Sequence, residues 1–216
     1  MIKNIACSWS GGKDSCFALM QTVKLGYTPK VVLTMLNENG QISRSHGISL
    51  ELLQQQASAL GLPMVTIASS WNNYEENFIN TLKDIKQKYN IDAMVFGDID
   101  IDRHRLWEEK VCEAANISAL LPLWQRSRKD LALEIIDSGI ESIVVSCNME
   151  LGEDFLGKSY SKALLSELEN TTIDQCGENG EFHSLVYNCP LFKNKLVLPE
   201  YTKKTVEKYC FVDWAK

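Results

Sequence analysis

The chain has 216 residues, of which 45% are hydrophobic, and its formal net charge is −6. A chain of this length can bury one large core, or one core with a small addition, but no stretch approaches the ~20 apolar residues that a membrane span requires. The acidic balance argues against a nucleic-acid-binding protein, because such proteins carry a basic surface that neutralises phosphates.

Seven cysteines occur singly along the chain. Without a C-x-x-C pair they do not match the usual ligand sets for zinc or iron–sulfur clusters. Their odd number and their scatter also argue against a disulfide framework. The N-terminus has a single Lys3 and no sustained apolar stretch, so we expect no signal peptide. These features predict reduced thiols in a cytoplasmic protein.

Apolar runs rich in valine and isoleucine alternate with helical patterns along the first part of the chain. The runs predict strands over residues 2–8, 30–36, 64–70, 92–99, 119–124 and 142–148. The spacing of apolar residues predicts helices over 15–25, 50–60, 74–89, 106–115 and 129–138. This alternation indicates a doubly wound, Rossmann-like α/β fold, in which helices cover both faces of a mostly parallel sheet.

The pattern changes near residue 151. One more helix is expected within 151–170, and turns, loops and short strands follow it. No linker rich in proline, glycine or serine marks the change, and no internal repeat is present. The sequence therefore predicts a Rossmann-like domain over residues 1–150 and a small C-terminal subdomain over 151–216, with a soft boundary.

The first predicted strand leads into a loop that reads "SWSGGKDS" (residues 8–15). Ligands of a parallel sheet bind where strands end, and the free N–H groups of a helix start attract anions. Glycines allow close approach of the backbone, and a lysine neutralises phosphate. The alternative is a tight turn in which Asp14 or Ser15 caps the following helix. We expect a phosphate site made by Ser8, Ser10, Gly11, Gly12, Lys13, Asp14 and Ser15.

This loop is not a Walker motif. Cys7 and Asp14 stand where that motif requires a glycine and a serine or threonine. The dinucleotide pattern G-x-G-x-x-G is not matched either.

A second glycine-containing stretch reads "GENGEFH" (residues 177–183). Glu178 and Glu181 flank Asn179 and Gly180 in one tight turn, and His183 follows. Such a group can orient a substrate, hold a metal or accept a proton. The alternative is a surface turn with solvated acids.

Further polar residues follow the predicted strands. Gly97 and Asp98 end the fourth strand, where ligand contacts concentrate, although Asp98 can equally cap the next helix. A basic cluster at 103–105 ends in Arg105, which can meet a phosphate or carboxylate or lie on a solvated helix start. His46, after the second strand, is a candidate neighbour of a nucleotide.

The loop at residues 8–15 resembles the S-G-G-x-D-S loop of the PP-loop ATP pyrophosphatases, the adenine nucleotide α-hydrolase-like superfamily. Three further stretches resemble, in the same order, the diphthine–ammonia ligase (diphthamide synthetase) family in its short, stand-alone form; they read "FGDIDIDRHRLWEEKVC" (96–112), "LPLW" (121–124) and "DQCGENGEFHSLVYNCPLF" (174–192). Lys158 and Ser161 stand where the family pattern has arginine and aspartate, and Ser184 where threonine is commoner.

The resemblance implies an ATP-dependent amide ligase. A carboxylate resists ammonia because its oxygen is a poor leaving group, whereas an acyl-adenylate releases AMP readily. The carboxylate attacks the α-phosphorus of ATP and expels pyrophosphate. The loop is expected to stabilise the charge of the pyrophosphate, and Mg²⁺ to bridge its oxygens. The expected cofactors are ATP and Mg²⁺, with metal ligands unassigned.

The expected roles fall into three groups. Lys13, Glu178, Glu181 and His183 are the candidate catalytic residues. The nucleotide is expected to contact residues 8–15, His46 and Gly97. The acceptor is expected to contact Asp98, Arg105, Gly177, Glu178, Asn179, Gly180 and Glu181.

The expected substrates are ammonia and a carboxylate acceptor, either diphthine on elongation factor 2 or a related group. We expect no direct binding to nucleic acid or membranes. A homo-oligomer is compatible with the sequence. Two rival readings are a PP-loop enzyme that modifies tRNA and a non-catalytic ATP-binding regulator.

Overall fold

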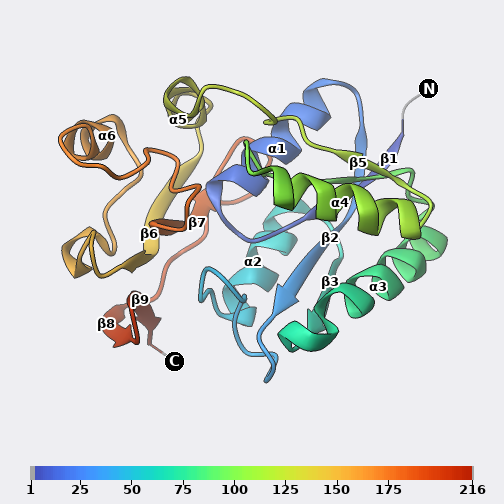
Figure 1. Ribbon diagram of the computed structural model, residues 1–216, viewed down its shortest axis with the longest axis horizontal. Helices are drawn as coiled ribbons and strands as arrows, with labels where there is room; N and C mark the ends of the chain where they lie inside the picture. Colours follow the sequence, from blue (N-terminus) through green and yellow to red (C-terminus); the bar gives the residue numbers. More distant parts are fainter. Residues whose placement is uncertain (1–2, 216) are drawn as a thin grey trace.

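The computed structural model describes residues 3–215 (Figure 1). Its parallel sheet contains β1 (Asn4–Ser8), β2 (Thr28–Leu36), β3 (Met64–Ala68), β4 (Ala93–Val95) and β5 (Ser118–Leu120), in the order β3-β2-β1-β4-β5. The strand order reverses at β1, which pairs with β2 on one side and β4 on the other. Ligands of such sheets bind beyond the strand ends at this reversal.

Helices cover both faces of the parallel sheet. One face carries α1 (Lys13–Lys24), α2 (Leu50–Leu60) and α5 (Arg128–Asp137), and the other carries α3 (Tyr74–Tyr89) and α4 (Asp102–Ala114). Side chains of a strand alternate between faces, and β1 shows this: Ile5 and Cys7 pack with the first helix group, Ala6 with the second. The predicted doubly wound α/β fold is confirmed.

A second, antiparallel sheet is built from later residues. It contains β6 (Glu141–Asn148), β7 (Phe182–Asn188), β8 (Tyr201–Val206) and β9 (Tyr209–Trp214), in the order β7-β6-β9-β8. The short helix α6 (Lys162–Leu168) and the 3₁₀ turn η2 (Glu153–Phe155) lie between β6 and β7 in the chain, and a further 3₁₀ turn, η1 (Trp71–Asn73), precedes α3.

The strand expected over 142–148 forms, but its placement in the parallel sheet is wrong. It pairs with β7 and β9, both antiparallel. Its six central residues are all buried, so it reads as the continuous apolar run that is typical of a parallel strand covered on both faces. A run of this kind does not indicate which strand it pairs with.

The two sheets share one hydrophobic core. Buried side chains of α1, β6 and β7, such as Leu19, Val144 and Leu185, belong to the same cluster as Ile5 of the parallel sheet. Figure 1 shows β7 and β6 beside α1, with the β8–β9 hairpin at the outer end. All seven cysteines are buried and unpaired. Within residues 3–215, no helix combines the length and apolar character of a membrane span.

Candidate active site

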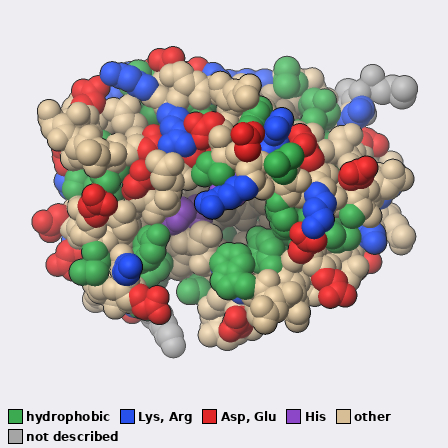
Figure 2. Space-filling model, in the orientation of Figure 1, with side chains coloured by type: hydrophobic (Ala, Val, Ile, Leu, Met, Phe, Trp, Pro, Cys, Tyr) green, Lys and Arg blue, Asp and Glu red, His purple; other side chains and the backbone are tan. Residues whose placement is uncertain are grey.

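A cavity of about 750 Å³ opens where β1 and β4 end. Figure 2 shows a hollow near the middle of this face, bordered by charged and apolar side chains and with a histidine at its edge. Both glycine-containing stretches reach the cavity, although they are far apart in the sequence. Of the expected site residues, the lining includes Ser8, Ser10, Asp14, Ser15, His46, Gly97, Asp98, Gly177, Glu178 and His183.

The loop at residues 8–15 packs against β7. The backbone N–H of Val186 donates to the Gly11 carbonyl at 2.9 Å, and the N–H of Lys13 donates to Ser184 Oγ at 3.1 Å. The amide of buried Gln56 donates to the carbonyls of Gly11 and Val186, at 2.9 and 2.6 Å. These bonds fix the 8–15 loop to β7, the strand in which the 177–183 stretch ends. Gln56 carried no sequence signal, because it reads as a surface position of α2.

The two glycines of this loop have no room for a side chain. Gly11 has φ +84, and a Cβ on Gly12 would lie 2.6 Å from His46 Nε2. Gly12 precedes α1, and no side chain caps the helix start. The alternative in which Asp14 or Ser15 caps α1 is therefore wrong, and the N-terminus of α1 faces the cavity with an anion-attracting dipole.

Lys13 does not reach the cavity surface. The residue is 1% exposed, and its Nζ donates to both carboxylate oxygens of Asp14, at 3.1 and 2.9 Å, and to the Cys176 carbonyl at 2.5 Å. The ammonium also lies 5.1 Å from the centre of the Tyr160 ring. Burial is the largest single influence and lowers the pKa of Lys13, but the charge and hydrogen bonds of Asp14, together with the charges of Cys176 and Glu178, outweigh it, so that the net pKa is raised. Lys13 is thus a buried partner of Asp14 rather than a mobile charge in the cavity.

Two histidines, His46 and His183, lie against each other at the cavity wall, with their rings tilted by 35°. Their ring centres are 4.4 Å apart. Burial lowers the pKa of His183 to about 4, and nearby Lys13 acts in the same direction. Burial, His183 and Lys13 together hold the pKa of His46 well below its usual range. Both imidazoles are therefore neutral at neutral pH, and each can offer a nitrogen as a hydrogen-bond acceptor.

Arg128 positions the 174–181 turn. Its guanidinium bonds to Asp100 after β4, to Asp174 Oδ2 at 2.9 Å and to Asn179 Oδ1 at 3.3 Å. One side chain at the start of α5 thereby ties together three segments of the site. Arg128 was not among the expected site residues, because a single arginine before a helix gives no signal of distant partners.

Glu181 lies inside this turn and not among the cavity-lining residues. Its carboxylate accepts hydrogen bonds from the backbone N–H of Asp174 at 3.3 Å and of Asn179 at 3.0 Å, and from the Asn179 amide at 3.0 Å. Glu181 and Asn179 thus hold the shape of the turn instead of lining the cavity. Gly177 and Gly180 adopt φ +69 and +85, which favours glycine there.

Glu178 does face the cavity, together with an acidic cluster. Its Oε1 accepts from the backbone N–H of Ile99 at 3.0 Å, and burial raises its pKa to about 7. Asp98 Oδ1 lies 2.7 Å from His104 Nδ1, and this bond raises the pKa of His104. Burial, and then Asp98, raise the pKa of Glu108 to about 11. His104 was expected only as part of the basic cluster at 103–105, and α4 begins at Asp102, four residues earlier than expected. Glu108, inside the predicted helix, was not among the expected site residues.

Arg105 points elsewhere. Its guanidinium lies over the Trp124 ring, 5.0 Å from the ring centre, and also bonds to Asp102 at 3.5 Å. Arg105 is not among the cavity-lining residues, whereas Arg103 and His104 are. On a helix, consecutive side chains point in different directions, so the basic cluster is split between two faces of α4. The ring of Trp124 thus packs against Arg105.

An aromatic wall completes the cavity. It is formed by Trp71, Tyr74 and Trp107, with ring centres 5.5 Å apart for Trp71–Tyr74 and 5.6 Å apart for Tyr74–Trp107. The sequence reading missed these residues, since aromatic residues at helical spacing are more often part of a core.

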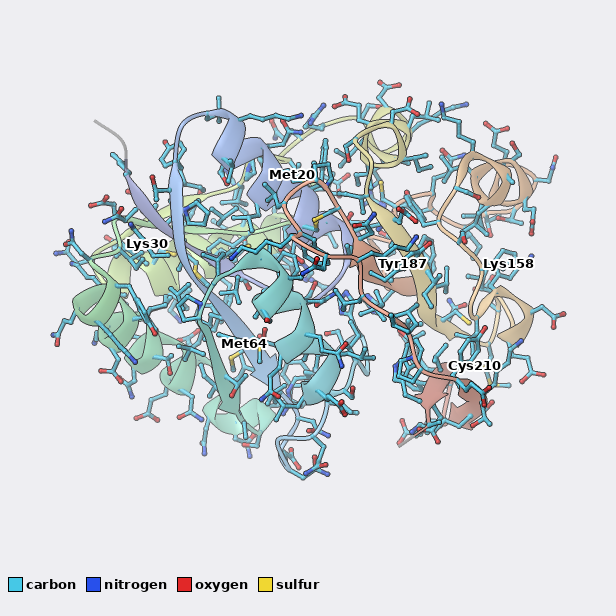
Figure 3. The ribbon with its side chains drawn as sticks, turned by 180° about the vertical axis from the view of Figure 1, so that it is seen from behind. Met20, Lys30, Met64, Lys158, Tyr187 and Cys210 are labelled. Carbon is cyan, nitrogen blue, oxygen red and sulfur yellow. The ribbon has the colours of Figure 1, made fainter. Side chains whose placement is uncertain are left out.

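Two of the three departures from the expected family pattern, Lys158 and Ser161, lie outside the cavity. Lys158 pairs with Glu167 on the surface, and Figure 3 shows it in the C-terminal part, away from the parallel sheet. Ser161 caps α6 by accepting from the Leu164 N–H at 3.4 Å. Ser184 lines the cavity and holds the phosphate loop. The Cys176 thiol, whose pKa burial raises to about 12, is not an activated nucleophile.

Family models match most of the chain. Residues 3–119 match the diphthamide synthase N-terminal domain, and residues 127–216 match the diphthamide synthase C-terminal domain. The chain belongs to the diphthamide synthase family. The predicted family resemblance is confirmed.

Several proteins named diphthine–ammonia ligase are similar to the chain. That of Rattus norvegicus is 29% identical over 90% of this chain and 82% of its own length. The protein of Danio rerio is 30% identical over 88% of this chain and 84% of its own length, and that of Homo sapiens is 26% identical over 90% of this chain and 82% of its own length. A solved structure, described as a predicted subunit of tRNA methyltransferase from Methanocaldococcus jannaschii DSM, is 17% identical with a TM-score of 0.47, over 89% of this chain and 100% of that one. That likeness decides nothing about function.

Proposed function

We propose that the protein is an ATP-dependent ligase that adenylates a carboxylate and transfers ammonia to it, releasing AMP and pyrophosphate. The observation that carries the proposal is that the phosphate loop and the 177–183 stretch line one cavity. Direct hydrogen bonds from Lys13 and Val186 join the loop to β7. A ligase needs this proximity, since its two reactants must be held in near-attack geometry.

In this proposal, the phosphates and the adenine of ATP contact two different regions of the cavity. The phosphates lie at the start of α1, within reach of the hydroxyls of Ser8, Ser10 and Ser15. The adenine packs against the aromatic wall, which offers flat apolar surface. Mg²⁺ accompanies the phosphates, and the cavity carboxylates are of the oxygen-ligand type that it prefers.

The acceptor carboxylate and ammonia occupy the side formed by Glu178, His46 and His183. The neutral imidazoles offer hydrogen-bond acceptors to ammonia without adding a positive charge that would repel ammonium. By its similarity to proteins named diphthine–ammonia ligase, the chain is proposed to act on diphthine of elongation factor 2 or on a related acceptor. The cytoplasmic location also stays a prediction.

Product analysis tests the proposal. ATP labelled in the α-phosphate, incubated with ammonium and elongation factor 2 that carries diphthine, should yield labelled AMP, with pyrophosphate in equal amount. Formation of ADP and orthophosphate would contradict it. Tight ATP binding with no turnover on any acceptor would favour the regulator, and AMP formation that requires tRNA would favour the tRNA-modifying enzyme.

A further inference from the structure

We propose that Asp98, His104 and Glu178 form a divalent-cation site at the floor of the cavity. The inference rests on the proposed function only in that the ion lies beside the bound nucleotide. The three side chains come from the end of β4, the first turn of α4 and the 174–181 turn. One ligand atom from each lies within 4.8 Å of the other two.

Glu178 is held in place by contacts outside the ion site, and Asp98 and His104 are held by their contact with each other. Glu178 Oε1 is fixed by the backbone N–H of Ile99 at 3.0 Å. The backbone N–H of Glu178 donates to Asp174 Oδ2 at 2.8 Å, and Arg128 holds Asp174 in turn. Asp98 and His104 already meet at 2.7 Å. Metal sites depend on such support, because contacts around the ligands keep them oriented when the ion is absent.

A fourth carboxyl group supplies the independent observation. Glu108 is 3% exposed, yet it lines this same cavity, and its Oε2 has no hydrogen-bond partner. The charges of Asp98 and Glu178 act on it. A buried carboxyl oxygen without a partner is costly. A cation between Asp98 and Glu178 would supply this missing contact and offset the charges of Asp98 and Glu178, whereas Glu108, whose pKa is about 11, is neutral.

The charge of the cavity leads to the same conclusion. Its lining carries five carboxyl groups and one arginine, Arg103. Asp14 and Glu75 pair with Lys13 and Lys110, and the raised pKa of Glu108 keeps that group neutral, so the charges of Asp98 and Glu178 remain without a lysine or arginine partner within residues 3–215. An ATP molecule and a carboxylate acceptor add further negative charge in a partly desolvated space. Anions enter such a space only when a cation offsets the repulsion. The five acids are Asp14, Glu75, Asp98, Glu108 and Glu178.

The ligand types narrow the choice of ion. Carboxylates suit Mg²⁺ and Mn²⁺, and an imidazole favours a transition metal. The mixture of two carboxylates and one histidine therefore favours Mn²⁺, which also provides a spectroscopic probe. An ion can reach His104, because 43% of its side chain is exposed.

Electron paramagnetic resonance with Mn²⁺, without nucleotide, tests the site. The wild-type protein should bind Mn²⁺, and Asp98→Asn and Glu178→Gln should each weaken binding by about tenfold or more. His104→Gln should abolish the coupling of a histidine nitrogen to the ion. Asp102→Asn is the matched control, because this carboxylate is 76% exposed at the start of the same helix. Circular dichroism checks the folding of each variant.

Two results would overturn the site. One is Mn²⁺ binding of equal strength in the wild type, Asp98→Asn and Glu178→Gln. The other is Mn²⁺ binding that appears only with ATP and without histidine coupling, which would mean that phosphates alone hold the ion. Either result leaves the AMP-forming reaction to be judged separately by product analysis.

Discussion

Lys13 illustrates at the scale of a single residue how the phosphate loop depends on buried charge. Its ammonium is enclosed by Asp14, the Cys176 carbonyl and two aromatic rings, those of Tyr160 and Phe182. This places Lys13 between the loop and the start of the 177–183 stretch. Its contribution to catalysis would be to hold Asp14 and the loop in shape.

Replacing Lys13 should therefore affect stability as well as turnover. Lys13→Met leaves the Asp14 carboxylate without its partner, and removal of one member of a buried pair costs about 3 kcal/mol. Urea unfolding should show this loss of unfolding free energy, whereas Lys24→Met, on the exposed end of the same helix, should change it by less than about 0.5 kcal/mol. Unchanged stability in Lys13→Met would contradict the buried-pair account.

His183 should make stability depend on pH. Its folded pKa of about 4 lies below the ordinary value of 6.5, so the unfolded chain takes up the proton first. Its contribution is full above about pH 6.5 and is lost as the pH falls toward 4, by an amount on the order of 1–3 kcal/mol.

Unfolding of His183→Gln at a series of pH values checks this. The variant should lose less unfolding free energy than the wild type between about pH 7 and about pH 4. His104→Gln, with chelator present, is the control of opposite sign, because Asp98 raises the pKa of His104 and stability from that group is lost as the pH rises. Parallel curves for the wild type and His183→Gln would show that this histidine is not buried as described.

At the scale of elements, two sets of hydrogen bonds fix the 174–181 turn. Arg128 of α5 bonds to two of its side chains, and Glu181, inside the turn, accepts from two of its backbone N–H groups. Arg128 bonds to Asp100, Asp174 and Asn179, so α5 and the segment after β4 are both joined to this turn. The 8–15 loop has its own supports in Gln56 and β7. Arg128 contacts none of them, and Lys13, through the Cys176 carbonyl, links the loop to the 174–181 turn.

Arg128→Gln should consequently impair the acceptor side more than ATP binding. We expect kcat/KM for the acceptor to fall by about tenfold or more, with less than about a twofold change in the Kd for ATP by calorimetry. Arg126→Gln is the matched control, because Arg126 pairs with Glu134 on the surface of the same region. Equal loss of ATP affinity and turnover would refute this difference between the acceptor side and ATP binding.

At the scale of the whole molecule, the repeating strands and helices were enough to predict the parallel sheet, and the two glycine-containing stretches marked the cavity. The misplaced β6 shows one limit, since a strand buried on both faces carries no sign of its partner. A second limit is seen at three residues that were expected in the site but do not line the cavity, Lys13, Glu181 and Arg105. Their residue types suggested a functional role, but the direction of a side chain depends on contacts with distant residues. Gln56, Arg128 and Glu108 act through such contacts alone.

The central claim is that this single cavity joins an acceptor carboxylate to the α-phosphorus of ATP. The most direct measurement follows heavy oxygen from the acceptor carboxylate of diphthine through one turnover with ATP and ammonium, using mass spectrometry of the products. An acyl-adenylate requires that one labelled oxygen appears in AMP while the acceptor becomes an amide. Label in orthophosphate together with ADP, or amide formation with unlabelled AMP, would contradict the account.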